Sequence, residues 1–270
     1  MDTALTEPAP LAGKTGRIHF LDEVRGLDIL LMVIFHGFYT LGWLLDISIG
    51  RELFLFFAPV EPFFAGLFIF ICGISCYLSH SNWRRGFLLL GISLGVSLVM
   101  AVFMPSQMIW FGILHLLAVS ILIFALLRPL LEKIPPLVGL LACMLLLTVC
   151  WSLPFHDGFR YGSLFGIRGL WTVRLPQSVI DNVWLYPLGL GKAPGPAADY
   201  FPILPWLFCF LGGSFVGRWA KDGRFPAWMY RSRARWLSWF GKHTLIIYIA
   251  HQPVIYGAGL AIQWLITVFA

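Results

Sequence analysis

Residues 27–45 read LDILLMVIFHGFYTLGWLL, a stretch that is apolar apart from a few scattered polar side chains. A helix needs about 20 mostly apolar residues to cross the hydrocarbon core of a bilayer, so this stretch predicts a membrane-spanning helix. Six further stretches share its character: residues 53–78, 87–104, 109–127, 137–153, 201–219 and 244–269. The sequence therefore predicts an all-α fold, a polytopic bundle of about seven transmembrane helices in one domain.

The composition of the 270-residue chain excludes an ordinary soluble domain. Hydrophobic residues make up 59% of the chain and charged residues 12%, whereas soluble domains have about 45–50% and about 25%. A disordered chain is also excluded, because it would need low hydrophobicity and high net charge. The cysteines all fall within expected spans, where free thiols act as small hydrophobes, so neither a disulfide framework nor a thiol-bound metal is expected.

The positive charges indicate how the chain is oriented. With the N-terminus placed inside, 14 of the 19 Lys and Arg residues fall in inner segments and 5 in outer segments. This bias follows the positive-inside rule, so residues 1–26 are expected to be a cytoplasmic segment before a single transmembrane domain, residues 27–270. The chain is expected to be a multi-pass protein of a bacterial-type plasma membrane. The net charge of +6 then needs no nucleic-acid partner, and membrane lipids are the expected surroundings.

Prolines predict two irregular places within the spans. Pro59 and Pro62 flank Glu61 in the second span, and Pro253 interrupts the seventh. Proline removes an amide donor, and irregular backbone at membrane depth is tolerated where protein or a water-filled cavity covers it. These positions predict a cavity toward the outer half of the membrane, on the side of a long outer loop, residues 154–200.

Polar side chains at the start of the chain lie on one face of the first helix. At about 100° per residue, one stripe collects Asp22, Arg25, Asp28, Met32, His36, Tyr39 and Trp43. Ionisable groups are costly inside a bilayer and mark function by default, so the stripe is expected to face the bundle interior. The Asp22–Arg25 pair is equally consistent with a structural ion pair, whereas His36 is the leading functional candidate.

Other spans offer possible partners for His36. They carry His115 in the fourth span, Tyr248, His251 and Gln252 on one face of the seventh, and Glu61 and Asp199 near outer span ends. No two of the three span histidines share a helix at the spacing of metal ligands, so no metal site is expected.

Four stretches of the chain resemble a known family. They read RIHFLDEVRG at 17–26, FICGIS at 70–75 with SNWRRG at 81–86, DYFPILPW at 199–206, and GKHTLIIYIAHQP at 241–253. In this order they are similar to the transmembrane acyltransferases, and more narrowly to the family of the heparan-α-glucosaminide N-acetyltransferase catalytic domain.

The resemblance implies an acyl-CoA donor, typically acetyl-CoA, and an amino-sugar or glycan acceptor; an oligomer is compatible with it. Cations suit phosphate, so the expected donor-binding residues are Arg25, Arg84 and Arg85, with Asn82 from the same motif. His36 is expected to be the base, with His251 or His115 to orient it or polarise the carbonyl and Asp28 as a supporting carboxylate. Direct transfer is favoured over an acyl-enzyme, because the cysteines have no activating neighbours in sequence, and an acyl-histidine intermediate is the open alternative. The alternative is a small transporter or ligand-binding membrane protein in which the polar stripe lines a path.

Overall fold

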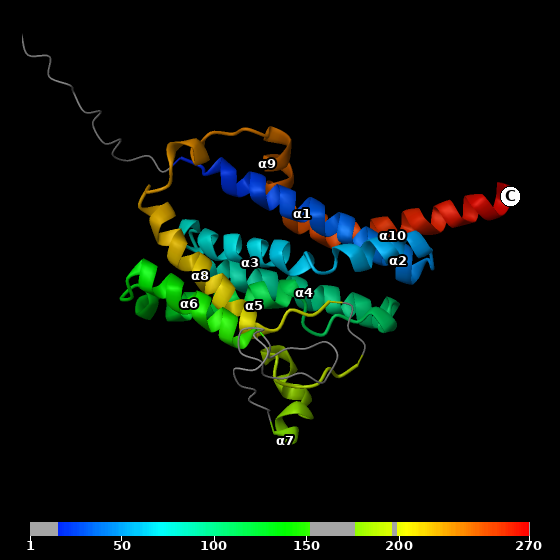
Figure 1. Ribbon diagram of the computed structural model, residues 1–270, viewed down its shortest axis with the longest axis horizontal. Coiled ribbons are helices and arrows are strands. Elements are labelled where there is room, and N and C mark those ends of the chain that lie inside the picture. The colour runs from blue at the N-terminus through cyan, green and yellow to red at the C-terminus, as the bar shows by residue number, and fades with distance from the viewer. Residues whose placement is uncertain (1–15, 152–175, 196–198, 270) are drawn as a thin grey trace, which may run out of the picture.

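The computed structural model describes residues 16–151, 176–195 and 199–269, and its regular elements are helices (Figure 1). Six of the helices described are long and apolar enough to span a membrane: α1 (His19–Tyr39, continued by a π-helix, Thr40–Leu44), α3 (Glu61–Leu78), α4 (Asn82–Phe103), α5 (Ile113–Leu131), α8 (Ile203–Lys221) and α10 (Thr244–Phe269). The predicted polytopic helical bundle is therefore confirmed, and the protein is an integral multi-pass membrane protein.

The remaining elements are shorter. They are α2 (Ser48–Phe57), α6 (Pro136–Cys150), α7 (Gln177–Ile180), α9 (Arg235–Lys242) and three 3₁₀ turns at Pro105–Gln107, Val183–Leu188 and Ala227–Tyr230. The expected span at 137–153 corresponds to α6, whose 15 residues fall short of the about 20 that a spanning helix needs. Most of the expected outer loop lies outside the described residues or in α7 and the 3₁₀ turn that follows.

The prolines act differently at the two predicted breaks. The chain leaves its helical path between α2 and α3, and Pro62 stands in the first turn of α3, where its missing amide has no intrahelical partner to lose. The expected interruption at Pro253 is wrong, because α10 continues through it. Pro253 costs α10 one backbone hydrogen bond. In an apolar medium, the other backbone hydrogen bonds that a continuous helix keeps outweigh that loss.

The polar stripe of α1 is inward-facing over most of its length. Asp22 and Asp28 are buried and His36 is half-buried, but Trp43 is 50% exposed, so its expected place on the stripe is wrong. Trp43 lies in the π-helix, whose wider turns shift the register.

Glycines allow the closest helix contacts. α3 packs against α8, and α1 packs against α9. A Cβ on Gly213 would overlap the Phe70 carbonyl, and one on Gly217 would come within 2.6 Å of the Ile74 carbonyl. Small residues four positions apart permit such close approach in membrane helix pairs. We call one end of the bundle the basic end. Helix α1 begins there, and α3, α5 and α8 terminate there.

Candidate active site

A large cavity opens at the basic end of the bundle. Its volume is about 680 Å³, within the range of ligand-binding pockets. Its polar lining includes Arg17 just before α1, Arg25 in α1, Ser75 in the last turn of α3 and Arg85 in the first turn of α4. Leucines from α4 and α5 form much of the apolar wall. We call it the arginine cavity.

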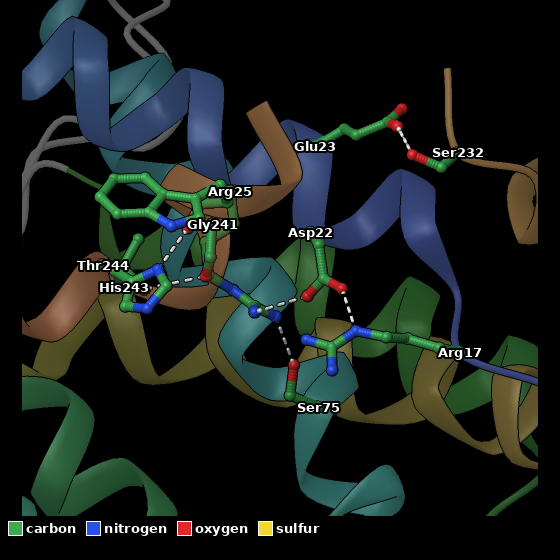
Figure 2. Close-up of polar contacts among 10 residues, drawn as sticks. Arg17, Asp22, Glu23, Arg25, Ser75, Ser232, Gly241, His243 and Thr244 are labelled. Carbon is green, nitrogen blue, oxygen red and sulfur yellow. Dashed lines mark hydrogen bonds and ion pairs between the residues drawn. The ribbon is translucent and has the colours of Figure 1, made fainter. Parts of the chain in front are cut away.

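Asp22 organises the cations of this cavity. Figure 2 shows its carboxylate between two guanidinium groups: Arg17 Nε donates to it at 2.5 Å and Arg25 Nη1 at 3.3 Å. Arg25 also donates to Ser75 Oγ at 2.9 Å. The hydrogen bond to Asp22 raises the pKa of Arg17 above its ordinary value. With Arg85, three guanidinium groups face one carboxylate, so the lining keeps an excess of positive charge.

A smaller cavity lies farther along α1. Its volume is about 40 Å³, and α1 contributes Asp28, Met32 and His36 to its lining. Glu61 at the start of α3 and Asp199 before α8 also line it. We call it the histidine cavity. Phe68 and Tyr248 line both cavities, so these two side chains form the boundary between them.

His36 lies beside His251, with the ring centroids 5.0 Å apart and the rings edge to face. The Nδ1 atom of His251 lies 2.5 Å from the Tyr248 carbonyl oxygen. A carbonyl only accepts hydrogen bonds, so Nδ1 carries the proton and Nε2 carries the lone pair. That Nε2 is buried and has no hydrogen-bond partner among the described residues.

Asp199 joins three parts of the bundle away from the basic end. One of its carboxylate oxygens accepts from the Ile113 amide at the start of α5, at 3.1 Å, and from the Tyr248 hydroxyl, at 3.2 Å. A carboxylate at a helix N-terminus is favourable, and Gly112 makes the approach possible because a Cβ there would overlap Asp199. Burial nevertheless raises the pKa of Asp199 to about 6.

The structure brings some predicted site residues together and separates others. Asp28, His36 and His251 gather at or beside the histidine cavity, and Arg25 and Arg85 line the arginine cavity. Three others line neither cavity, namely His115, Asn82 and Arg84. His115 is buried between α4 and α5, with Nε2 3.4 Å from Ser97 Oγ. Asn82 donates to the Cys76 carbonyl at 2.9 Å, which closes the α3–α4 turn, and Arg84 is exposed.

Sequence reasoning missed Arg17, Ser75 and Phe68 as cavity residues. Arg17 and Ser75 lie inside the recognised motifs, but nothing in their spacing relates them to Arg25. Phe68 is one of many apolar residues in its span, so no sequence signal distinguishes it. Among the described residues, no three His, Cys, Asp or Glu side chains form a group suited to a metal ion.

Comparison with known proteins identifies the family. The family model described as heparan-alpha-glucosaminide N-acetyltransferase, catalytic, matches residues 17–253. Neither the curated proteins nor the solved structures include a match. The matched range contains the lining of both cavities apart from Gly16 in the larger one. Membership supports a membrane-bound transferase of acyl groups. The chain belongs to the family of the heparan-alpha-glucosaminide N-acetyltransferase catalytic domain.

Proposed function

We propose that the protein transfers an acyl group, acetyl, from acyl-CoA to an amino-sugar or glycan acceptor, with His36 as the base. The observation that carries the proposal is the pair of adjoining cavities. One is lined by guanidinium groups and the other by a histidine, and Phe68 and Tyr248 separate them. A donor with anionic phosphates and a long apolar arm fits this arrangement, with its thioester at the boundary.

The arginine cavity has the chemistry that such a donor requires. Guanidinium groups bind phosphate through charge-assisted, often bidentate hydrogen bonds, and Arg17, Arg25 and Arg85 offer three of them. The apolar wall includes Leu89 and Leu117, which suits the pantetheine arm. Arg25 and Arg85 therefore remain the proposed donor-binding residues, now joined by Arg17, whereas exposed Arg84 and turn-forming Asn82 are not part of this cavity.

The histidine cavity has the chemistry that the acceptor requires. Glu61 and Asp199 line it, and carboxylates attract an amine and accept hydrogen bonds from sugar hydroxyls. His36 takes the proton as the acceptor nitrogen or oxygen attacks the thioester carbonyl. The new bond to the acyl carbon forms, the carbon–sulfur bond breaks, and His36 returns the proton to the departing thiolate.

His251 is proposed to position His36. Its free Nε2 lone pair is an acceptor for one ring N–H of His36, which leaves the lone pair on the other His36 nitrogen for the substrate. The two rings do not hydrogen-bond in the present arrangement, but χ2 of histidine is soft and catalytic hydrogen bonds often tighten only when substrate binds.

The basic end is proposed to face the cytoplasm of a bacterial-type cell, where acyl-CoA is made. Six cations of the α8–α10 connection and its flanks lie at this end: Lys221, Arg224, Arg231, Arg233, Arg235 and Lys242. The positive-inside rule places such a cluster on the cytoplasmic side.

Binding of acetyl-CoA to the purified protein tests the donor. Arg85→Gln is expected to weaken binding about 10- to 100-fold, because a hydrogen bond to a charged group contributes about 1.5–3 kcal/mol. Arg84→Gln is the matched control: it removes the same charge from the neighbouring residue, outside the cavity, and is expected to change affinity by less than about threefold. Absence of acyl-CoA binding, or equal losses in both variants, would contradict the proposed donor site.

The base is tested separately. His36→Ala is expected to keep acetyl-CoA affinity and to lower kcat about 10²- to 10⁴-fold. Activity within about tenfold of the unsubstituted protein would remove His36 from the role of base while leaving the donor site intact.

A further inference from the structure

The connection from α8 to α10 forms a basic strap, residues 222–242, along the start of α1 (Figure 1). It contains the 3₁₀ turn Ala227–Tyr230 and α9. Trp228 packs edge to face on Phe20 of α1, with ring centroids 4.9 Å apart. A Cβ on Gly241 would overlap the backbone oxygen of Asp22. The strap is therefore packed closely on the bundle.

Glu23 of α1 fixes the middle of the strap. One oxygen of its buried carboxylate accepts from Ser232 Oγ at 3.2 Å, Arg233 N at 2.7 Å and Ala234 N at 2.9 Å; Figure 2 shows the bond to Ser232. These bonds hold the strap through its backbone and Ser232. The arginine side chains of the strap are not used for this attachment.

Arg231, Arg233 and Arg235 are exposed and alternate along the chain with Ser232 and Ala234. None of the three forms a salt bridge to a described acidic side chain, and none lines the arginine cavity. Arg233 lies over the Trp228 ring at 5.4 Å, a cation–π contact that keeps its guanidinium beside an exposed indole.

Large exposed aromatic side chains share the strap with these arginines. Trp228, Trp236 and Trp239 are 43%, 60% and 54% exposed. Indole rings prefer the interface between hydrocarbon and headgroups, whereas unpaired guanidinium groups prefer phosphate. Because the protein spans a membrane, a surface carrying both groups at one end of the bundle matches a leaflet that contains anionic lipid.

We propose that the basic strap is a binding surface for the phosphate headgroups of anionic phospholipids. Arg231, Arg233 and Arg235 bind the headgroups, and Trp236 and Trp239 enter the interface beside them. The surface is separate from the arginine cavity, and this proposal does not depend on the acyltransferase activity.

The test uses the full chain, delipidated in neutral detergent and titrated with phosphatidylglycerol or phosphatidylcholine while native mass spectrometry counts bound lipids. Arg231→Gln/Arg235→Gln is compared with Arg128→Gln/Lys133→Gln, which removes the same charge at the same end of the bundle. Arg233 is kept because it packs on Trp228. Thermal melting verifies that both variants fold. The strap variant is expected to fold because Glu23 holds the strap through other atoms.

The strap variant is expected to bind phosphatidylglycerol about 30-fold more weakly, since each Arg near an anionic surface contributes about 1 kcal/mol and 1.4 kcal/mol is tenfold. The Arg128/Lys133 variant is expected to lose at most about fivefold, because Arg128 is already paired with Glu132 and Lys133 alone contributes about 1 kcal/mol. The weak phosphatidylcholine binding is expected to stay unchanged. Equal phosphatidylglycerol affinity in both variants would overturn the proposal. Displacement by millimolar inorganic phosphate would indicate a site for free anions, and weaker acetyl-CoA binding of the strap variant without lipid would assign the arginines to the donor; either result would also overturn it.

Discussion

Asp199 lies where three elements meet, and its environment makes it sensitive to pH. Besides its bonds to Ile113 and Tyr248, it lies within electrostatic range of Glu61 from α3 and Tyr186 from the 3₁₀ turn. Burial raises the pKa of Asp199 to about 6, so the carboxylate is largely charged above pH 7 and protonates as the pH falls through 6. Protonation weakens the hold on Tyr248, one of the two side chains between the cavities.

We therefore expect kcat/KM to fall as the pH is lowered through about 6, because the proposed acceptor cavity then loses the Asp199 carboxylate. Asp199→Asn is expected to lower activity at pH 7.5, our choice of reference pH, and to remove this acidic limb from the pH profile. The control is Asp222→Asn, which removes an exposed carboxylate at the basic end. This variant is expected to keep the acidic limb of the pH profile. If the limb persists unchanged in Asp199→Asn, another group is responsible, the His36–His251 pair being the next candidate.

His251 provides a second prediction for a single residue. His251→Leu is expected to lower kcat about 10- to 100-fold with little change in KM for acyl-CoA, because it removes the acceptor for the His36 N–H. His251→Gln keeps an oxygen acceptor and is expected to recover part of the loss. The ¹⁵N shifts of the unsubstituted protein are expected to show a protonated Nδ1 and an unprotonated Nε2 in His251. A protonated Nε2, or equal losses in both variants, would refute the positioning role.

Helical periodicity was sufficient to find Asp28 and His36, since both follow from one stripe on α1. It was not sufficient for Arg84 and Arg85. These neighbours differ by about 100° around α4, and only the packing of α4 on α5 decides which of them reaches the cavity. Likewise, a histidine within a span is costly wherever it lies, so sequence alone did not separate His115, which contacts Ser97 and lines neither cavity, from His251 beside His36.

At the scale of elements, the contact between α3 and α8 depends on Gly213. Gly213→Ala is expected to lower the free energy of unfolding by about 1–3 kcal/mol, as overpacking does, because the added Cβ overlaps the Phe70 carbonyl. Gly91→Ala on α4 is the matched control: nothing lies within 4 Å of its Cβ position, so the higher helix propensity of alanine is expected to leave stability equal or slightly raised. Thermal unfolding in detergent measures both. A similar loss of unfolding free energy in both variants would mean that the close approach of α3 and α8 does not depend on Gly213.

Hydropathy predicted the presence of the helices better than it predicted where they begin, end or change geometry. Apolar length marked the spanning helices, and Pro59 and Pro62 marked a real break at the start of α3. Hydropathy does not register a π-helix, so the shift at Trp43 was missed. It also cannot weigh one lost hydrogen bond against the continuity of a long helix, which explains the wrong expectation at Pro253.

At the scale of the whole molecule, the two cavities belong to opposite ends of the bundle. The arginine cavity includes Ala220, in the last turn of α8, and Arg85, in the first turn of α4. The histidine cavity includes Glu61 and Ile113, where α3 and α5 begin. Because α3, α5 and α8 all run toward the basic end, the proposed function has the donor and the acceptor approach each other from different sides of the membrane.

This arrangement predicts transfer across the bilayer, testable in sealed proteoliposomes. With acetyl-CoA outside and acceptor trapped inside, product is expected inside, and the reverse loading is expected to work as well when molecules insert in both orientations. With both substrates on one side, each protein molecule presents its donor cavity or its acceptor cavity to them, but not both. Turnover is then expected to stop and to return when detergent permeabilises the vesicles. Full turnover with both substrates on one side would show that donor and acceptor enter from the same end, and the functional separation of the two cavities at Phe68 and Tyr248 would have to be abandoned.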